Sequence, residues 1–441
     1  MRLEGMLDRM KKKETNKKAF LLALTILQAC LTYAQSIQQF SQDTVFISIP
    51  DAEQRFVNKN LSLLMSQYDV SIAKTAYLQA KLWYNPNLYY GTTLYNQESK
   101  KFFDNNYPAY GEVDNTIQVQ QLLTIGGRHS ATANLANVGV KQAQFQLADL
   151  LRSLKYQMYT DFSDLYDNQQ LVKMYLIEET KINHLIDITQ QLYSKGNAAG
   201  EDVIRLQAQY QDVIAQEVSC EQSIYSDEED LRILLAYPGR VYLIAKITVP
   251  ESINIPAYPA LQDSAKKNRP DLMLANAGVE FSEKNLTLQH ATSVPDLTLG
   301  VSNIGAGSVL PSYWGISASM DLPVFNRNQW NVASAKYGES QSQLNDSLIL
   351  YTVQSQVTTA FCNLYRLNTQ LHQIDKNYEQ NLEDMMDNAF KNYEKRYISL
   401  LDYLSETTTY IDGKTNLINL RMHYFNAIHE LNYSTGIDII K

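Results

Sequence analysis

Hydrophobic positions along the chain change their spacing from every second residue to every third or fourth. Over residues 116–128 apolar and polar side chains alternate, which is the pattern of a β-strand. From about Leu147 to Leu165 the apolar positions step by three and four, which predicts one stripe of a helix. No proline occurs from residue 109 to 237. We therefore expect a helix of about 65 residues, roughly 100 Å long, that ends at Gly196.

The same change of spacing occurs again about two hundred residues later. Residues 312–322 alternate, with Trp314 on the apolar face, and a turn at 323–328 leads into a second proline-free run. Both halves therefore predict the order helix, strand, loop, strand, long helix, turn, helix. In the first half the expected elements are a helix capped by Asp51 and ending near 83, a strand at 87–96, a polar loop at 98–114, a strand at 116–123, the long helix, and a return helix that ends before 238. After a link at 237–257, the second half predicts a helix at 258–291, a strand at 296–303, a loop at 304–312, a strand at 312–322, a long helix to about 396 and a return helix to about 431.

Helices of this length do not fit inside one globular core, so they indicate a coiled coil, a solenoid or a tube. Each of the four strands has about the ten residues that a tilted strand needs to cross a bilayer. Four strands are too few to close a barrel, and open strand edges are not tolerated in lipid. Two chains would supply eight strands and three chains would supply twelve.

The N-terminus has the features of an export signal. A lysine-rich segment precedes a short apolar run at 19–27, and small residues follow up to Ala34, so we expect a signal peptide at 1–34 with cleavage after Ala34. The alternative is lipidation at Cys30. The rest of the chain divides into two repeats, which we place at 35–250 and 251–441.

The composition excludes several classes of function. The formal net charge is −9, which makes an exported protein a poor candidate for binding nucleic acid. Cys220 and Cys362 do not make a disulfide framework, and we expect both to be small buried residues. The six histidines are scattered and are interpreted as surface residues. No catalytic or metal-ligating pattern is present, so the sequence predicts neither an enzyme nor a cofactor.

The tryptophans fall at positions that suit a membrane. If the strands cross a bilayer, Trp83 and Trp330 lie near the interface on the helix side, and Trp314 lies toward the other interface, as in an aromatic belt. The alternative is that these are core aromatics. Residues such as Gln118 and Ser317 would then face a water-filled pore, although the same residues suit the solvent face of an ordinary sheet.

Several short motifs, in order along both halves, resemble the TolC-like outer-membrane efflux channels. The motifs are Asn85-Pro86-Asn87-Leu88 with Val294-Pro295-Asp296-Leu297, Gln121 to Arg128, Asn268-Arg269-Pro270-Asp271-Leu272, Leu322 to Arg327, and Leu401-Asp402-Tyr403-Leu404 with Thr407-Thr408-Thr409. The resemblance implies a mainly α protein with a small β part. In that fold long antiparallel helical hairpins form a periplasmic α-barrel, continuous with a twelve-stranded transmembrane β-barrel built from three chains.

The resemblance also implies partners and a location. The chain would form a homotrimer in the outer membrane of a Gram-negative bacterium, in contact with outer-membrane lipid. Its helical hairpin tips would dock onto a periplasmic adaptor (a membrane fusion protein), which joins it to an inner-membrane efflux pump. The tip residues are Gly196 and Gly200 in the first hairpin and Lys395, Arg396 and Tyr397 in the second.

Two aspartates occupy matching positions just past the hairpin tips. Asp402 matches the acidic position of the family at the periplasmic gate, and Asp202 matches Asp402 at an offset of two hundred residues. The alternative is that each is an acidic residue in the first turn of a helix, where the dipole favours it. The chain departs from the family at Arg396, where the second hairpin often has glycine, and at Ser405, where the gate has a second acid.

The sequence thus favours a passive conduit, the exit duct of a tripartite efflux system. The alternative function is a periplasmic coiled-coil scaffold or adaptor that never enters a membrane. Four alternating strands flanked by aromatic residues favour the conduit, because an adaptor usually carries a compact β-domain rather than strands continuous with long helices.

Overall fold

The computed structural model describes residues 43–92, 94–97, 100–102, 115–239, 241–250, 253–304 and 313–440. The signal peptide expected at 1–34, with its lipidation alternative at Cys30, lies outside these residues. Most of the loop expected at 98–114 and nearly all of the loop expected at 304–312 also lie outside them.

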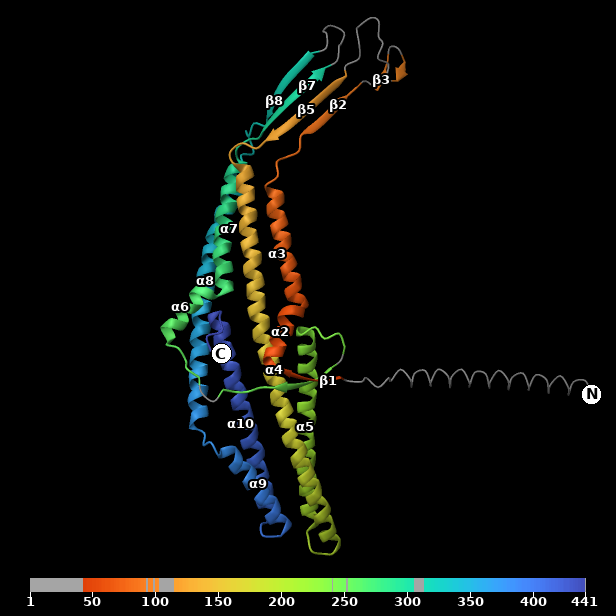
Figure 1. Cartoon of the computed structure of the whole chain (residues 1–441), viewed down its shortest axis with the longest axis vertical. Helices are drawn as coiled ribbons and strands as arrows, with labels where there is room; N and C mark the ends of the chain where they lie inside the picture. Colours follow the sequence, from red (N-terminus) through yellow and green to blue (C-terminus); the bar gives the residue numbers. More distant parts are fainter. Residues whose placement is uncertain are drawn as a thin grey trace, which may run out of the picture.

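The described chain is an elongated rod with a sheet at one end and two helical hairpin tips at the other (Figure 1). Its sheet is antiparallel, with strands in the order β2-β5-β7-β8. The strands are β2 (Asn87–Gly91), β5 (Thr116–Leu123), β7 (Leu297–Ile304) and β8 (Tyr313–Met320). The four predicted strands are confirmed, and they join the two halves of the chain through the β5–β7 pair.

Each strand of the sheet continues into a helix. The helices are α3 (Leu61–Ala80), α4 (Arg128–Ser194), α7 (Pro270–Thr292) and α8 (Gln329–Gln373). They pack in the order α3-α4-α7-α8, the same order as their strands (Figure 1). The prediction of one unbroken helix of about 65 residues is confirmed, because α4 has 67 residues. Among the described residues, no helix combines the length and the apolar composition that crossing a membrane requires.

Two antiparallel hairpins form the end of the rod opposite the sheet. In the first, α5 (Gly200–Leu234) runs back along α4, and in the second, α10 (Leu400–Thr435) runs back along α9 (Tyr378–Glu394) and then α8. A shared core of buried residues from all four of α4, α5, α9 and α10 holds the hairpins together, centred on Ile182, Leu206, Met386 and Tyr403.

The waist of the rod contains a small sheet that was not predicted. β1 (Asp43–Ser48) pairs in parallel with β6 (Val241–Lys246), so the interpretation of 237–257 as a simple link was wrong. The side-chain amide of Gln169 on α4 holds β6 in place. Its Nε2 donates to Leu243 O at 2.5 Å, and its Oε1 accepts from Ala245 N at 3.2 Å. One buried side chain thus satisfies two backbone groups of the strand edge, as a neighbouring strand would.

Three expected helices are each divided in two. α2 (Ile49–Lys59) and α3 are separated at Asn60, whose side chain caps α3 by accepting from Leu63 N and also donates to Leu234 O. α6 (Tyr258–Asn268) and α7 are separated at Arg269, which is extended because Pro270 follows it. α8 and α9 are separated at 374–377, where Asp375 accepts from the backbone N–H of Asn377.

Other expected details were also wrong. The helix expected to start at Asp51 starts at Ile49 after Ser48, whose hydroxyl donates to the Asp51 carboxylate. The strand expected at 87–96 ends at Gly91, and a short hairpin follows. In it β3 (Tyr95–Asn96), at the end of the expected strand, pairs with β4 (Lys101–Phe102), which was expected to be part of a loop.

The expected burial of the cysteines and the expected exposure of the histidines were wrong in part. Cys220 is half-buried beside the core of the hairpins, and Cys362 is exposed. His429 lies mostly inside the waist, stacked on Tyr159 with ring centroids 3.5 Å apart.

Candidate functional site

The tip of the first hairpin is closed by a left-handed turn. α4 ends at Ser194, and Gly196 follows with φ of +75°. Gly196 N donates to Tyr193 O at 2.9 Å and Asn197 N donates to Leu192 O at 2.8 Å, which is the Schellman pattern. The turn therefore satisfies the last carbonyl groups of α4 with backbone donors.

The tip of the second hairpin has the same turn without a glycine. Arg396 has φ of +63°, and its N–H donates to Tyr393 O at 2.9 Å. Tyr397 N donates to Asn392 O at 2.8 Å. The departure from the family at Arg396 thus leaves the turn unchanged, and an arginine adopts a conformation that favours glycine. Lys395, Arg396 and Tyr397 are all exposed.

Asp402 closes the first turn of α10. Its Oδ2 accepts from Ser399 N at 3.2 Å and from Ser399 Oγ at 2.7 Å, and its own N–H donates to Ser399 Oγ at 3.2 Å. This reciprocal arrangement is a capping box. The bonds from the Ser399 hydroxyl and the Ser399 N–H hold the pKa of the Asp402 carboxyl below its usual value. The side chain is exposed, so a charged carboxylate stays at this end of the rod.

Asp202 lies in the first turn of α5 and close to the second hairpin. Its side chain makes none of the capping bonds that Asp402 makes. Burial raises the pKa of the Tyr393 hydroxyl, and the negative charge of Asp202 adds to that effect. The Tyr393 hydroxyl also lies 3.4 Å from the Thr189 hydroxyl on α4. Thr189 and Tyr393 therefore form a polar contact between the two hairpins, within the field of the Asp202 carboxylate.

A buried carboxylate also joins the hairpins, and the sequence analysis missed it. Glu178 on α4 is 0% exposed, and it pairs with Lys181, which also reaches Asp387 on α9 at 3.0 Å. Burial raises the pKa of Glu178, and Lys181 opposes that shift. The signal was a glutamate between Met174 and Ile182 on an otherwise apolar stripe of α4.

The sheet has one apolar face and one uncharged polar face. On the polar face, Gln118 and Gln120 of β5 lie opposite Ser302 and Gly300 of β7, and Gln118 Nε2 donates to Ser317 Oγ on β8 at 3.1 Å. The opposite face of the sheet carries mainly leucine, valine, isoleucine and tryptophan. None of the residues of β2, β5, β7 and β8 is Asp, Glu, Lys, Arg or His.

The three tryptophans lie at the two ends of the sheet. Trp83 falls between α3 and β2 and stacks on His129 with centroids 4.6 Å apart. Trp330 falls in the first turn of α8. Trp314 is near the opposite end of the sheet, paired with Asn303. All three side chains are well exposed, so within this chain they are not core residues.

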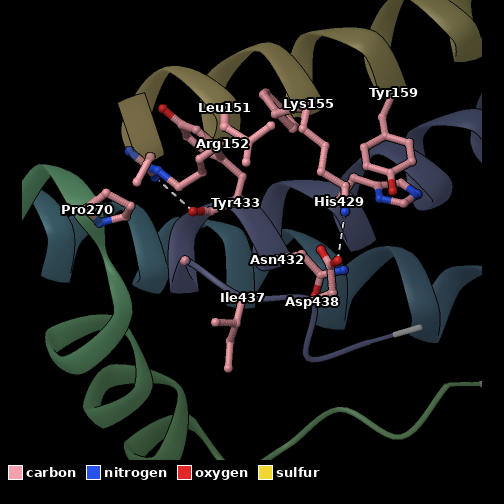
Figure 2. Close-up of a pocket in the computed structure, with 13 residues that line it drawn as sticks. Leu151, Arg152, Lys155, Tyr159, Pro270, His429, Asn432, Tyr433, Ile437 and Asp438 are labelled. Carbon is pink, nitrogen blue, oxygen red and sulfur yellow. Dashed lines mark hydrogen bonds and ion pairs between the residues drawn. The ribbon is translucent and has the colours of Figure 1, made fainter. Parts of the chain in front are cut away.

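A cavity of about 300 Å³ lies at the waist between α4 and the end of α10 (Figure 2). Its cations are paired, because Lys155 Nζ lies 2.7 Å from Asp438 Oδ2 and Arg152 lies 2.6 Å from Asp149. Burial lowers the pKa of His429 to about 4. The cavity therefore presents no free charge, and we assign its residues to the packing of the waist.

The chain is similar in sequence to known outer membrane proteins. No family model matches the chain. The outer membrane protein TolC of Vibrio cholerae serotype O1 (strain ATCC 39315 / El Tor Inaba N16961) is 23% identical over 331 residues, covering 67% of this chain and 70% of that protein. The outer membrane protein TolC of Salmonella enteritidis is 25% identical over 291 residues, covering 59% and 56%.

A solved structure has the same fold over almost its full length. Crystal structures of CusC, reported in connection with transmembrane channel formation, superpose with a TM-score of 0.71 at 16% identity, covering 90% of this chain and 96% of that one. The resemblance predicted from the motifs is thus confirmed, and so is the helix-rich fold with its long hairpins. The relatives are named as outer membrane proteins, in agreement with the expected location.

Proposed function

We propose that this chain, a TolC-like protein by sequence and a channel subunit by fold, forms the trimeric outer-membrane duct of an efflux system. The observation that carries the proposal is the open sheet. Among the described residues, β2 and β8 are each paired on one side only, and an unpaired strand edge in lipid leaves its backbone polar groups unsatisfied. Further copies of the chain must therefore pair with both edges.

The direction of the strands suits closure into a ring. β2 leads away from the helices and β8 leads back to them, so β8 of one chain can pair antiparallel with β2 of the next. Because the two edges differ, the contact is head to tail and closes as a cycle. Three chains supply twelve strands, the number that the family resemblance implies, whereas two would supply eight.

The edge helices support the same closure. α3 exposes an apolar stripe at Leu61, Met65, Tyr68 and Ile72, with the spacing of one helix face. α8 exposes a second stripe, at Tyr337, Leu344, Leu348 and Tyr351. Apolar surface of this extent is costly to leave in water. In a ring, α3 of one chain lies next to α8 of its neighbour, and the two stripes cover each other.

The apolar face of the sheet favours a membrane protein over a periplasmic scaffold. Ile316 is 88% exposed and Trp314 is 76% exposed, both on the same face of β8. Ring closure at the strand edges leaves this face outward, where lipid can cover it. A scaffold in water has no such cover. Trp83 and Trp330 then fall at the helix-side interface.

The proposed role is a passive conduit. The helical part would extend into the periplasm, where the tips (Gly196, Gly200, Lys395, Arg396 and Tyr397) would dock onto an adaptor joined to an inner-membrane pump. Asp402 and Asp202 would form the acidic gate at the same end. The two repeats at 35–250 and 251–441 would each supply two strands and one hairpin.

Conductance across a planar lipid bilayer tests this function. The purified protein, added to one side, should produce discrete current steps of uniform size, because a closed barrel makes a pore of one diameter. A preparation that fractionates with soluble periplasmic proteins and produces no current steps would instead support the scaffold.

A further inference from the structure

We propose that the turn between β8 and α8, residues 321–328, binds the phosphate of an anionic phospholipid where the sheet meets the helices. Arg327 would contact the phosphate, and Phe325 would lie among the acyl chains beside it. The inference rests on the proposed function, because it needs the sheet to lie in a bilayer, and it adds the class of lipid. Three features support it: an apolar surface, the structure of the turn and an unpaired cation.

The turn continues the apolar surface of the sheet past the end of β8. Phe325 is 93% exposed and Leu322 is 76% exposed. Trp330, in the first turn of α8, is 79% exposed. Together with Ile316 on the apolar face of β8, these side chains extend the apolar surface from the strand to the start of the helix. Such surface is costly to leave in water, and a bilayer around the sheet would cover it.

Hydrogen bonds within the turn and to α7 set its shape. Arg327 N donates to Gln329 Oε1 at 2.8 Å. Asn328 N donates to Asn326 Oδ1 at 3.0 Å, and Asn328 Nδ2 donates to Gln289 O on α7 at 2.8 Å. The N–H groups of Arg327 and Asn328 are therefore used inside the turn, so these two residues can reach an anion only through the Arg327 side chain.

That side chain is a cation without a partner. In the middle of the sheet, Arg128 at the start of α4 forms an ion pair with Asp296 before β7. Arg327 is exposed, and within the described chain its guanidinium forms no ion pair and donates no hydrogen bond. The turn also contains Asp321. Because Asp321 follows Met320 of the apolar face, strand alternation directs its carboxylate toward the polar face.

The other edge of the chain has the same combination of cation and tryptophan. Lys81 follows α3, and its ammonium lies 4.7 Å from the centre of the Tyr77 ring. Trp83 comes two residues later and is 64% exposed. Lys81 precedes the first residue of β2 by six positions, and Arg327 follows the last residue of β8 by seven. In the proposed ring α3 lies next to α8 of the neighbouring chain, so the two cations would lie at one level, where they repel each other unless an anion lies between them.

An anionic phospholipid complements both the charge and the apolar surface. Its phosphate suits a guanidinium, which binds phosphate through two parallel N–H donors, and its acyl chains would cover Phe325 and Trp330. Tryptophan at the level of the headgroups is common in membrane proteins. The chain as a whole has a formal net charge of −9, so local cations rather than general attraction have to hold an anionic lipid. A soluble anion would leave the apolar part of the turn uncovered.

Lipid titration followed by native mass spectrometry tests the proposal. The purified protein is stripped of lipid in detergent and titrated with phosphatidylglycerol or, separately, with phosphatidylcholine, which has no net charge. Phosphatidylglycerol should bind more tightly. One cation near an anionic lipid contributes about five-fold in affinity, so Arg327→Gln should weaken phosphatidylglycerol binding by about that factor and leave phosphatidylcholine binding unchanged.

Control variants separate the charge from the apolar contact. Arg327→Lys keeps the charge and should keep most of the preference. Arg366→Gln removes another exposed arginine of α8, roughly 55 Å along the helix from its first residue, and should change neither affinity. Phe325→Ser should weaken the binding of both lipids equally, because it removes an acyl-chain contact and no charge. The replaced side chains are all exposed, so the variants should melt at the temperature of the wild type.

Several results would overturn the proposal. The first is equal affinity of the wild type for the two lipids, or a preference for phosphatidylglycerol that persists in Arg327→Gln. Another is competition by glycerol phosphate at the concentration of the lipid, because the turn would then bind a free anion. A third is failure of both lipids to bind while a photoreactive side chain at position 325 crosslinks to a second protein in membranes, which would make the turn a protein contact.

Conductance of the same preparation separates this inference from the proposed function. A conducting protein without a lipid preference refutes only the lipid site. A protein that does not conduct refutes the proposed function.

Discussion

An arginine placed on the apolar face of β8 should destabilise the protein in a membrane much more than one placed on the polar face. Ile316 is three residues from Tyr313 and four from Met320, the ends of the strand. At about 3.3 Å per residue it lies roughly 10 and 13 Å from those ends, close to the middle of the hydrocarbon layer. Ile316→Arg should therefore cost about 2–4 kcal/mol per chain.

The neighbouring residue provides a control at the same depth. Ser317 points to the polar face, where its hydroxyl packs closely over Gly300. Ser317→Arg loses the hydrogen bond from Gln118, which contributes about 0.5–1.5 kcal/mol. The two arginines should thus differ by roughly 0.5–3.5 kcal/mol.

The assay is guanidinium unfolding of each variant in phosphatidylcholine vesicles. A lower midpoint at an unchanged slope reports a loss of stability without a change in the surface exposed. Equal losses for Ile316→Arg and Ser317→Arg would refute the assignment of the two faces, and with it the contact between this sheet and lipid.

Three further predictions concern the helical part. Arg396→Gly should raise the free energy of unfolding by about 1 kcal/mol by relieving the left-handed arginine, which thermal denaturation would detect. Burial, reinforced by Asp230 and Asp164, raises the pKa of Asp161 to about 7. Since the folded pKa is above the unfolded value, Asp161 should contribute stability that increases as the pH falls from 8 to 4, and melting experiments on Asp161→Asn should show that this contribution is lost. Asp402→Asn should lower the preference for cations, measured as the single-channel reversal potential, and Asp202→Asn should lower it more weakly. Unchanged reversal potentials in both variants would mean that the two aspartates only stabilise the first turns of α10 and α5.

The parts of the fold predicted best are those in which a strand changes into a helix. β5 and α4 followed from a change of period, with no proline and only Gly139 as a glycine within the long helix. The sheet order could not be predicted, because pairing β5 with β7 joins strands almost two hundred residues apart. Periodicity gives the faces of a strand but not its neighbours.

The waist was predicted least well. The break at Asn60 depends on a bond to Leu234 O, and β6 depends on Gln169, so both are tertiary effects without a local signal. The break at Arg269 did have a signal, the proline that follows it, which was overlooked in favour of the longer helical pattern.

At the hairpin tips, the sequence repeat located the turns but not their chemistry. The offset of two hundred residues aligned Gly196 with Arg396. It did not indicate that the arginine adopts the same left-handed turn, because side-chain preference alone argues against that conformation. The first-turn position of Asp402 was one of its two predicted roles, but the capping bonds with Ser399 were not predicted. The contact between Thr189 and Tyr393 joins two hairpins and could be found only in the packed structure.

The number of chains in the detergent-solubilised protein tests the central claim most directly. Native mass spectrometry should give a single species with three times the mass of the processed chain, because the open edges at β2 and β8 must both be paired. A monodisperse monomer would contradict the closed barrel, and a dimer would contradict the twelve-stranded form.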